Sequence, residues 1–287
     1  MTAVTDSQPA RTDQEHAPGD EPPLLVVDRV TVGFGGLLAL DEVSMSVGRG
    51  EVVGVIGPNG AGKTTLFNVI SGFVHPSSGT ITYRGTVLRR HHPHDLAKLG
   101  IARTLQGIGL CPGLTVHENV MLGAEPTLRS DLGSAFLGIW RSSREERRVA
   151  ARAMSVLEEL GAADYARRMP AALPYAFQKR TALARALMAE PRLLLLDEPA
   201  SGLSESEMDE LGSRVRLLTD RMSVLLVEHH MDLVMSVCDR LVVLNFGQVI
   251  AEGTPAAIRA DPDVATAYLG DPVHEDAPPP GQATNDA

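Results

Sequence analysis

The stretch "EVVGVIGPNGAGKTTLF" at residues 51–67 restricts the fold of this chain more than any other segment. A β-branched, apolar run ends at Gly57, a glycine-rich turn follows, and a segment with helical character begins near Lys63. Glycines let the backbone N–H groups of such a turn point inward without Cβ clashes, and the following helix presents the positive end of its dipole. This order of strand, G-x-x-x-x-G-K-[ST] and helix predicts a phosphate-binding loop. The residues expected to contact phosphate are Gly57, Pro58, Asn59, Gly60, Ala61, Gly62, Lys63, Thr64 and Thr65.

The segment "RLLLLDEP" at 192–199 supplies the acidic groups that such a loop requires. Four consecutive leucines predict a strand buried on both faces, and Asp197 lies at its carboxyl end, where parallel sheets bind ligands. We expect Lys63 to bridge the β- and γ-phosphates of a nucleotide, and Thr64 and Asp197 to hold Mg²⁺. Glu198 can then polarise the attacking water. Without the upstream loop, the Asp-Glu pair could equally be a helix cap.

A third strand end, "LLVEHHMD" at 225–232, carries His229. A histidine at the carboxyl end of a neighbouring parallel strand can donate a hydrogen bond to the γ-phosphate. A lone histidine is more often structural, and His230 beside it can simply begin the next helix. His229 is therefore a candidate through its position rather than its type.

The order of the elements predicts the fold class. Helices expected at 177–189, 205–218 and 230–237 alternate with strands at 192–197, 222–227 and 240–245, which implies a mostly parallel sheet covered by helices on both faces. Upstream, a helix is expected at 63–73 and strands at 24–34, 43–47 and 79–85, with the glycine-rich "GGLLALDE" as a turn between the first two strands. Residues 91–160 contain more helix than strand, including a periodic helix at 143–160 that ends at Gly161, and are expected to be an inserted helical subdomain.

Composition narrows the function classes. The net charge of −10 and the pI of about 5.4 argue against broad attraction to nucleic acid or anionic lipid. No apolar run approaches the roughly 18–20 residues that span a bilayer, so a role in transport would need separate membrane subunits.

Residues 1–23 and 271–287 are predicted to be disordered tails, and no secretory signal is expected at the start. Cys111 and Cys238 are expected to be buried, reduced thiols, and "RRHHPHD" at 89–95 a solvated turn rather than a metal site.

Taken together, these segments resemble one family, the ATP-binding subunits of ABC transporters, over about residues 24–270. The resemblance implies a P-loop NTPase of the ABC type, with a mostly parallel core sheet, an N-terminal antiparallel β subdomain and an α-helical subdomain at about 91–185. It also implies that Phe34 stacks on adenine and that Gln106, in "ARTLQ", approaches Mg²⁺ and the attacking water. "SGLS" at 201–204 takes the place of the D-loop, although Ser204 stands where Asp or Asn is usual.

Finer features are similar to the branched-chain amino acid (LivG-like) group, among them "FGGLLALDEVS", "LTVHENVMLGA" and the ending "PDVATAYLG". Amide and urea importers share much of this pattern. The resemblance implies a second ATPase subunit as dimer partner, permease subunits in the membrane, an extracytoplasmic substrate-binding protein that acts indirectly, and a peripheral location on the cytoplasmic face of the plasma membrane.

The family's signature segment is altered at Leu173–Phe177, which reads "LPYAF" where members of the family have LSGGQ or a variant such as LSYGQ. The family works as head-to-tail dimers, in which this segment closes over ATP bound by the partner. Pro174 removes a hydroxyl and an N–H group, and we expect the methyl of Ala176 to obstruct close approach of the backbone to phosphate. We therefore expect impaired hydrolysis at the partner's site, which substitution of both Pro174→Ser and Ala176→Gly should relieve.

Two other functions remain open. A non-transport ABC protein usually carries two nucleotide domains or a long coiled coil, and 287 residues contain neither. A regulatory or structural ATP-binding module with negligible turnover is favoured by the altered signature, whereas Glu198 and His229 favour an ATPase. The interpretation adopted is an ATPase subunit that drives uptake of branched-chain amino acids or related amides.

Overall fold

The computed structural model describes residues 21–104, 108–127 and 139–269. Its centre is a six-stranded sheet in the order β10-β9-β3-β8-β7-β6. Five strands run parallel and β10 pairs antiparallel with β9. The strands are β3 (Val52–Ile56), β6 (Ile101–Arg103), β7 (Leu193–Asp197), β8 (Ser223–Val227), β9 (Arg240–Asn245) and β10 (Gln248–Gly253). The predicted α/β class with a mostly parallel core sheet is confirmed.

The leucine run of β7 shows why this sheet is buried on both faces. Leu193 and Leu195 pack in one apolar core, and Leu194 and Leu196 pack in the other. Successive side chains of a strand point to opposite faces, so an uninterrupted apolar run requires cover on both sides. That cover comes from α1 (Lys63–Ile70) on one face and from α7 (Glu205–Leu218) and α8 (Met231–Val237) on the other.

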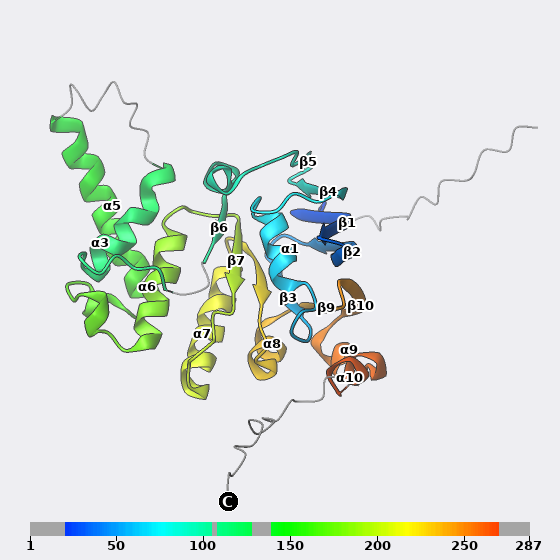
Figure 1. Ribbon diagram of the computed structural model, residues 1–287. Coiled ribbons are helices and arrows are strands. Elements are labelled where there is room, and N and C mark those ends of the chain that lie inside the picture. The colour runs from blue at the N-terminus through cyan, green and yellow to red at the C-terminus, as the bar shows by residue number, and fades with distance from the viewer. Residues whose placement is uncertain (1–20, 105–107, 128–138, 270–287) are drawn as a thin grey trace, which may run out of the picture.

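A second, antiparallel sheet lies beside α1 and has the order β2-β1-β4-β5 (Figure 1). Its strands are β1 (Leu25–Phe34), β2 (Leu37–Val47), β4 (Ser78–Tyr83) and β5 (Thr86–Val87). The antiparallel β subdomain is thus confirmed, but the turn expected over residues 35–42 is wrong. Only Gly35 and Gly36 turn, both with positive φ, and β2 begins at Leu37. Two glycines that accept positive φ suffice for a tight hairpin.

The helical group occupies one end of the molecule, to the left of the sheets in Figure 1. It comprises α3 (Val116–Met121), η2 (Leu122–Thr127), α5 (Ile139–Glu159), η3 (Ala163–Tyr165), η4 (Pro170–Ala172) and α6 (Tyr175–Leu187). The expected face of α5 is buried at Ala153, Val156 and Leu157, and Gly161 follows with positive φ. Residues 101–103, which the sequence placed within the insertion, instead form β6 of the core sheet. They are preceded by η1 (Pro93–Asp95) and α2 (Leu96–Leu99).

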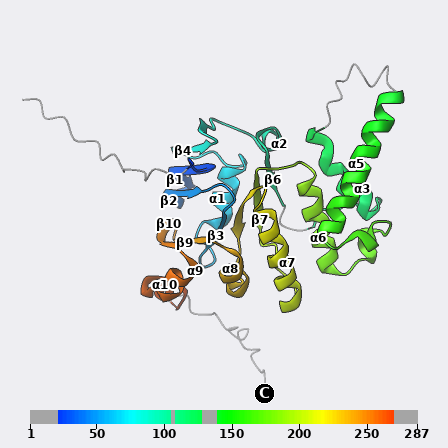
Figure 2. The same ribbon diagram turned by 180° about the vertical axis from the view of Figure 1, so that it is seen from behind.

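The chain returns to the β end through α9 (Pro255–Ala260) and α10 (Pro262–Leu269), which lie beyond β10 (Figure 2). Neither helix was predicted, nor was β10. Within the ranges that the structure covers, no helix combines the length and apolar character needed to cross a membrane. The expected tails lie outside the described residues, apart from 21–23.

The two cysteines differ, and the expectation that both are buried is wrong for one of them. Cys238 is buried in the core beside β3, whereas Cys111 is exposed in the connection between the core sheet and the helical group. Cys111 begins an exposed turn that the Leu114 N–H closes by donating to the Cys111 carbonyl at 3.2 Å, so its thiol lies outside the core. The "RRHHPHD" segment is a loop with a short 3₁₀ turn, as expected, in which His92 and His94 are exposed.

Candidate nucleotide site

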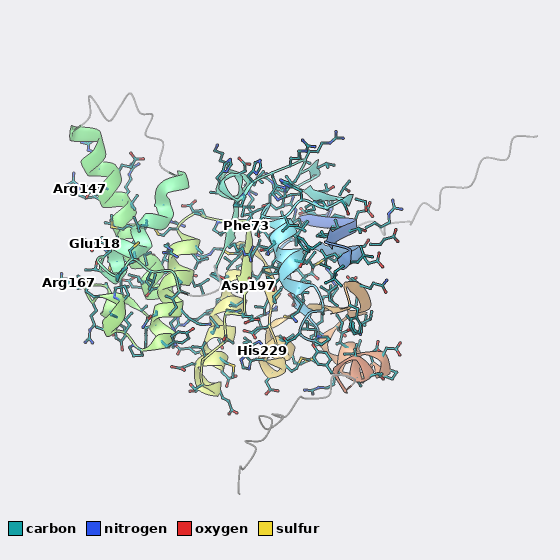
Figure 3. All side chains as sticks on the ribbon, in the orientation of Figure 1. Phe73, Glu118, Arg147, Arg167, Asp197 and His229 are labelled. Carbon is teal, nitrogen blue, oxygen red and sulfur yellow. The ribbon has the colours of Figure 1, made fainter. Side chains whose placement is uncertain are left out.

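Sheet register brings three candidate segments to one edge. Val55 of β3 pairs with Val227 of β8, and Val227 in turn pairs with Asp197 of β7. Because these strands are parallel, the residues that follow them emerge at the same edge of the sheet. The phosphate-binding loop, Asp197 and the 228–230 segment are therefore neighbours, as the sequence predicted. Figure 3 shows Asp197 at the middle of the molecule, at the end of β7, and His229 below it.

The loop between β3 and α1 has the tight backbone that its glycines predict. Gly57 has φ +149, and a β-carbon there would lie 2.1 Å from the Leu244 carbonyl oxygen. At Gly62, φ is +103 and a β-carbon would lie 2.5 Å from the Ala39 carbonyl oxygen. Any side chain at either position would collide with backbone, so β9 and β2 together press the loop into this shape.

Lys63 closes the loop on itself. Its ammonium donates to the carbonyl oxygens of Gly57 and Pro58, at 2.7 and 2.8 Å. Burial lowers the pKa of Lys63, and the negative charge of Glu198 partly opposes that effect. A half-buried cation held by neutral carbonyls is stabilised further by an anion, so the loop is prepared for phosphate. In the first turn of α1, Thr64 is exposed and Thr65 is half-buried.

Asp197 has one engaged and one unpaired oxygen. Its Oδ2 accepts a hydrogen bond from Arg103 at 2.9 Å, within a buried ion pair. Its Oδ1 is buried and has no hydrogen-bond partner in the part of the chain that the structure describes. A buried carboxylate oxygen without a donor is costly, and a hard cation prefers such an oxygen as ligand. The residues present therefore fit a magnesium ion at this edge.

Glu198 and His229 lie on neighbouring strand ends. Glu198 has φ +47, an uncommon conformation for a residue other than glycine, and its N–H donates to the Val227 carbonyl at 2.9 Å. The side chain of His229 is 53% exposed, with its Nδ1 3.6 Å from the carboxylate of Glu228. An exposed histidine in this place is free to meet a ligand, which favours the functional interpretation over the structural one.

Two predicted contacts remain untested. Phe34 is 52% exposed at the end of β1, next to the hairpin whose second strand packs on Gly62, so it is available for stacking. Gln106 lies outside the described residues.

Four functional candidates were missed by sequence reasoning. Arg103 pairs with Asp197, and Glu228 is a buried carboxylate whose oxygens accept backbone N–H groups. Lys179 donates to the carbonyls of Glu198 and Pro199, and Tyr268 of α10 interacts with the Gly57 backbone. A signal existed for two of them: a charged residue directly beside an apolar strand run, as at Arg103 and Glu228, is rarely buried unless paired. For the other two, no local pattern reveals the contact.

The altered segment has a different geometry from the one expected. Pro174 is exposed at the N-cap of α6, and Tyr175 follows it, 44% exposed. Ala176 is only 3% exposed, so its methyl is buried within this chain. This burial argues against the expectation that the methyl obstructs a phosphate, because the first turn of α6 directs residue 176 into the core. Phe177 also faces inward, with its ring 4.3 Å from that of Tyr165.

The segment at 201–204 connects this region to α7. Ser204 caps α7 through a capping box, with its N–H and its hydroxyl both donating to Glu207 at 2.8 Å. A serine serves this role as well as the Asp or Asn expected from the resemblance.

Comparisons with known proteins agree with this geometry. The family model "ABC transporter" matches residues 40–201, and "Branched-chain amino acid ATP-binding cassette transporter" matches 248–274. The high-affinity branched-chain amino acid transport ATP-binding protein LivG of Salmonella typhimurium is 41% identical over 251 residues, which are 87% of this chain and 98% of that protein. BraF of Pseudomonas aeruginosa, with the same description, is 40% identical over the same shares.

Solved structures show the same fold. A nucleotide-free ATP-binding cassette from an ABC transporter superposes with a TM-score of 0.76 at 32% identity, covering 87% of this chain and all of that one. The ADP conformation of the ATP-binding cassette MJ1267 gives a TM-score of 0.75 at 32% identity, over 88% of this chain and all of that one. The chain therefore belongs to the ATP-hydrolysing, ATP-binding subunits of ABC transporters and, among them, to the branched-chain amino acid group.

Proposed function

We propose that this chain binds Mg²⁺ and ATP at the carboxyl edge of β3, β8 and β7. Hydrolysis of this ATP then drives uptake of branched-chain amino acids or related amides. The observation that carries the proposal is the unpaired, buried Oδ1 of Asp197 beside a preformed phosphate-binding loop. The names of the relatives support the substrate class, since they describe branched-chain amino acid transport.

Each residue has a distinct role in this proposal. Residues Gly57–Thr65 bind the phosphates through backbone N–H groups, and Lys63 exchanges its two carbonyl partners for phosphate oxygens. Thr64, Asp197 and Gln106 would hold Mg²⁺, which neutralises charge on the phosphates when bound. Glu198 orients the attacking water and takes its proton, and His229 donates to the γ-phosphate. Phe34 stacks on adenine.

The family supports the partners of this chain. A second ATP-binding subunit pairs head to tail with this one, permease subunits form the pathway, and an extracytoplasmic binding protein delivers substrate. The chain would then lie peripherally on the cytoplasmic face of the membrane.

The start of α6 would face ATP that is bound to the partner subunit. Pro174 offers that ATP neither a hydroxyl nor an N–H group, and this position is the clear chemical loss, since the methyl of Ala176 is buried. Loss of a single preorganised donor costs about 10²–10³ in rate in other enzymes. The remaining N–H groups and dipole of α6 would recover part of it.

The test is the ATPase rate of the complete complex, isolated through a tag on this chain. Glu198→Gln should lower the rate contributed by this chain's own site at least about 100-fold without weakening ATP binding. The opposite finding, no turnover in the unaltered complex combined with ATP-dependent dimerisation, would support the regulatory module instead. Uptake of labelled leucine into vesicles that contain the complex, measured against an amide, tests the substrate class.

A further inference from the structure

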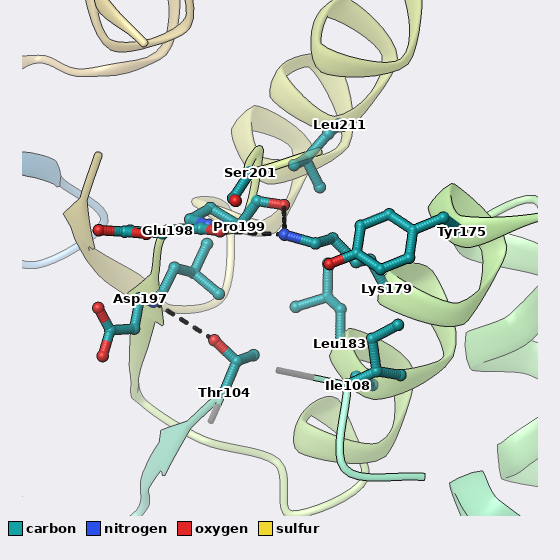
Figure 4. Close-up of a pocket in the computed structure, with 12 residues that line it drawn as sticks. Thr104, Ile108, Tyr175, Lys179, Leu183, Asp197, Glu198, Pro199, Ser201 and Leu211 are labelled. Atoms are coloured by element: carbon teal, nitrogen blue, oxygen red, sulfur yellow. Dashed lines mark hydrogen bonds between the residues drawn. The ribbon is translucent and has the colours of Figure 1, made fainter. Parts of the chain in front are cut away.

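The turn Glu198–Ala200, which carries the proposed water-activating carboxylate, is held by a half-buried lysine and a buried glutamate. Lys179 of α6 donates to the carbonyl oxygens of Glu198 and Pro199, at 3.1 and 2.9 Å (Figure 4). The Ala200 N–H donates to Oε1 of Glu228 at 2.7 Å. The two residues that bracket the turn come from α6 and from the end of β8, far apart in sequence.

Every backbone N–H and carbonyl group of the Glu198–Ala200 turn has a hydrogen-bond partner. The Glu198 N–H donates to Val227, the Ala200 carbonyl accepts from Leu203, and Pro199 has no N–H to satisfy. The Glu198 carbonyl accepts from the Ser201 N–H at 3.3 Å as well as from Lys179, and Lys179 and Glu228 supply the remaining partners of Pro199 and Ala200. A residue other than glycine with φ +47, as at Glu198, persists only when its surroundings over-determine it.

Glu228 also fixes the neighbouring strand end. Its Oε2 accepts from the N–H groups of His229 and His230, at 2.8 and 3.2 Å. The Glu228 side chain is fully buried, and its two oxygens accept from three backbone N–H groups. One carboxylate thus links the turn after β7 to the segment that carries His229.

Lys179 extends the connection to the start of α6. Its ammonium lies 5.5 Å from the centre of the Tyr175 ring, one helical turn earlier. Tyr175 is packed against Gly202, where a β-carbon would lie 3.0 Å from the ring. Burial lowers the pKa of Lys179, and the charges of Glu228 and Glu198 oppose that effect.

We propose that Lys179 and Glu228 are positioning residues which together hold the Glu198–Ala200 turn, and which connect the start of α6 to the water-activating carboxylate of this chain's own site. The proposal rests on the proposed function, in which Glu198 activates water and the start of α6 faces the partner's ATP. A movement of α6 on contact with that ATP would then reach Glu198 through one side chain.

The experiment uses the complete complex and measures both kcat and the Kd for ATP. Lys179→Met, which keeps the length of the side chain without its donors, and Glu228→Gln should each lower kcat about 10- to 100-fold, as removal of supporting contacts does elsewhere. The Kd for ATP should change less than about twofold, because neither residue contacts the phosphate-binding loop. Lys179→Arg retains the donors and should restore most of kcat.

Matched controls are Lys98→Met on the exposed surface of α2 and Glu158→Gln on the exposed face of α5, which should leave both quantities unchanged. The double variant Lys179→Met/Glu228→Gln distinguishes a shared role from two separate ones. Since both residues act on one turn, it should be within about threefold of the slower single variant.

Three results would overturn the proposal: full kcat in both single variants, a Kd raised in parallel with the loss of kcat, or losses that multiply in the double variant. If Lys179→Met does not fold, as judged by thermal unfolding, Glu228→Gln carries the decision, because Lys179→Arg is expected to keep most of kcat. Failure of the proposed function is a separate outcome, since it is seen as an unaltered complex whose turnover does not respond to Glu198→Gln.

Discussion

The carboxyl edge of β3, β8 and β7 and the start of α6 are the two regions expected to meet ATP, and they differ in construction. The strand edge is built from backbone held by tertiary contacts: Gly57 and Gly62 have no space for a side chain, and Asp197 has a buried oxygen ready for a cation. The start of α6 presents an exposed Pro174 and Tyr175, with no side-chain cap. The first region therefore has its candidate groups held in place by contacts within this chain, and the second presents exposed side chains.

This difference shows that a motif cannot be judged from its letters alone. Both substitutions in "LPYAF" are expected to be harmful from the sequence, Ala176 more so than Pro174, yet Pro174 faces solvent and Ala176 faces the core. The helix that carries them also supplies Lys179 to the intact site. The start of α6 is therefore connected to the strand edge through Lys179.

The largest expected effect is on Asp197. Asp197→Asn removes the charge that would hold Mg²⁺ and leaves Arg103 buried without its counter-charge. We expect hydrolysis to fall by about 10²–10³ or more, and the free energy of unfolding to fall by about 3 kcal/mol. ATPase assays across a Mg²⁺ titration and chemical denaturation measure these two quantities. An Asn variant with unaltered Mg²⁺ dependence would contradict the assignment.

A smaller effect is expected at the loop. Gly57→Ala places a methyl against the Leu244 carbonyl, so ATP binding should weaken about 100-fold, since the loop must open to accommodate it. Gly85→Ala is the matched control, because Gly85 also has positive φ but has open space around it. It should cost about 1–2 kcal/mol of stability from the backbone conformation and leave the Kd for ATP unchanged. If both variants lost the same affinity for ATP, the loss would come from backbone strain at positive φ and not from a collision with the Leu244 carbonyl.

The reactivity of the two cysteines tests how tightly the core behind the phosphate-binding loop is packed. Burial raises the pKa of Cys238 to about 12, whereas Cys111 is exposed. At pH 8 a thiol reagent should modify one cysteine per folded chain and two per unfolded chain, as counted by mass spectrometry.

The folded pKa of Cys238 exceeds its unfolded value of 9.0. Its contribution to the free energy of unfolding is therefore complete below pH 9 and is lost as the pH rises toward 12. Rapid modification of Cys238 in the folded chain would show that the core behind the phosphate-binding loop opens readily.

Much of the strand edge could be predicted from sequence, because strand, loop and helix follow one another there within about fifteen residues. The parallel order of β3, β8 and β7 then places Asp197 and His229 without further information. Other features depend on packing between distant segments. β6 has three residues, too few for a periodic pattern. The burial of Ala176 and the reach of Lys179 to Glu198 follow from how α6 docks, which no local pattern records.

The most direct test of the contrast between the two regions separates the two substitutions at the start of α6. Pro174→Ser and Ala176→Gly are made singly in the complete complex, and the ATPase rate is measured at saturating ATP. We predict that Pro174→Ser raises the rate severalfold by supplying a hydroxyl donor, while Ala176→Gly gives no increase because the methyl it removes is buried. An increase with Ala176→Gly alone, or an unchanged rate with Pro174→Ser, would contradict the account.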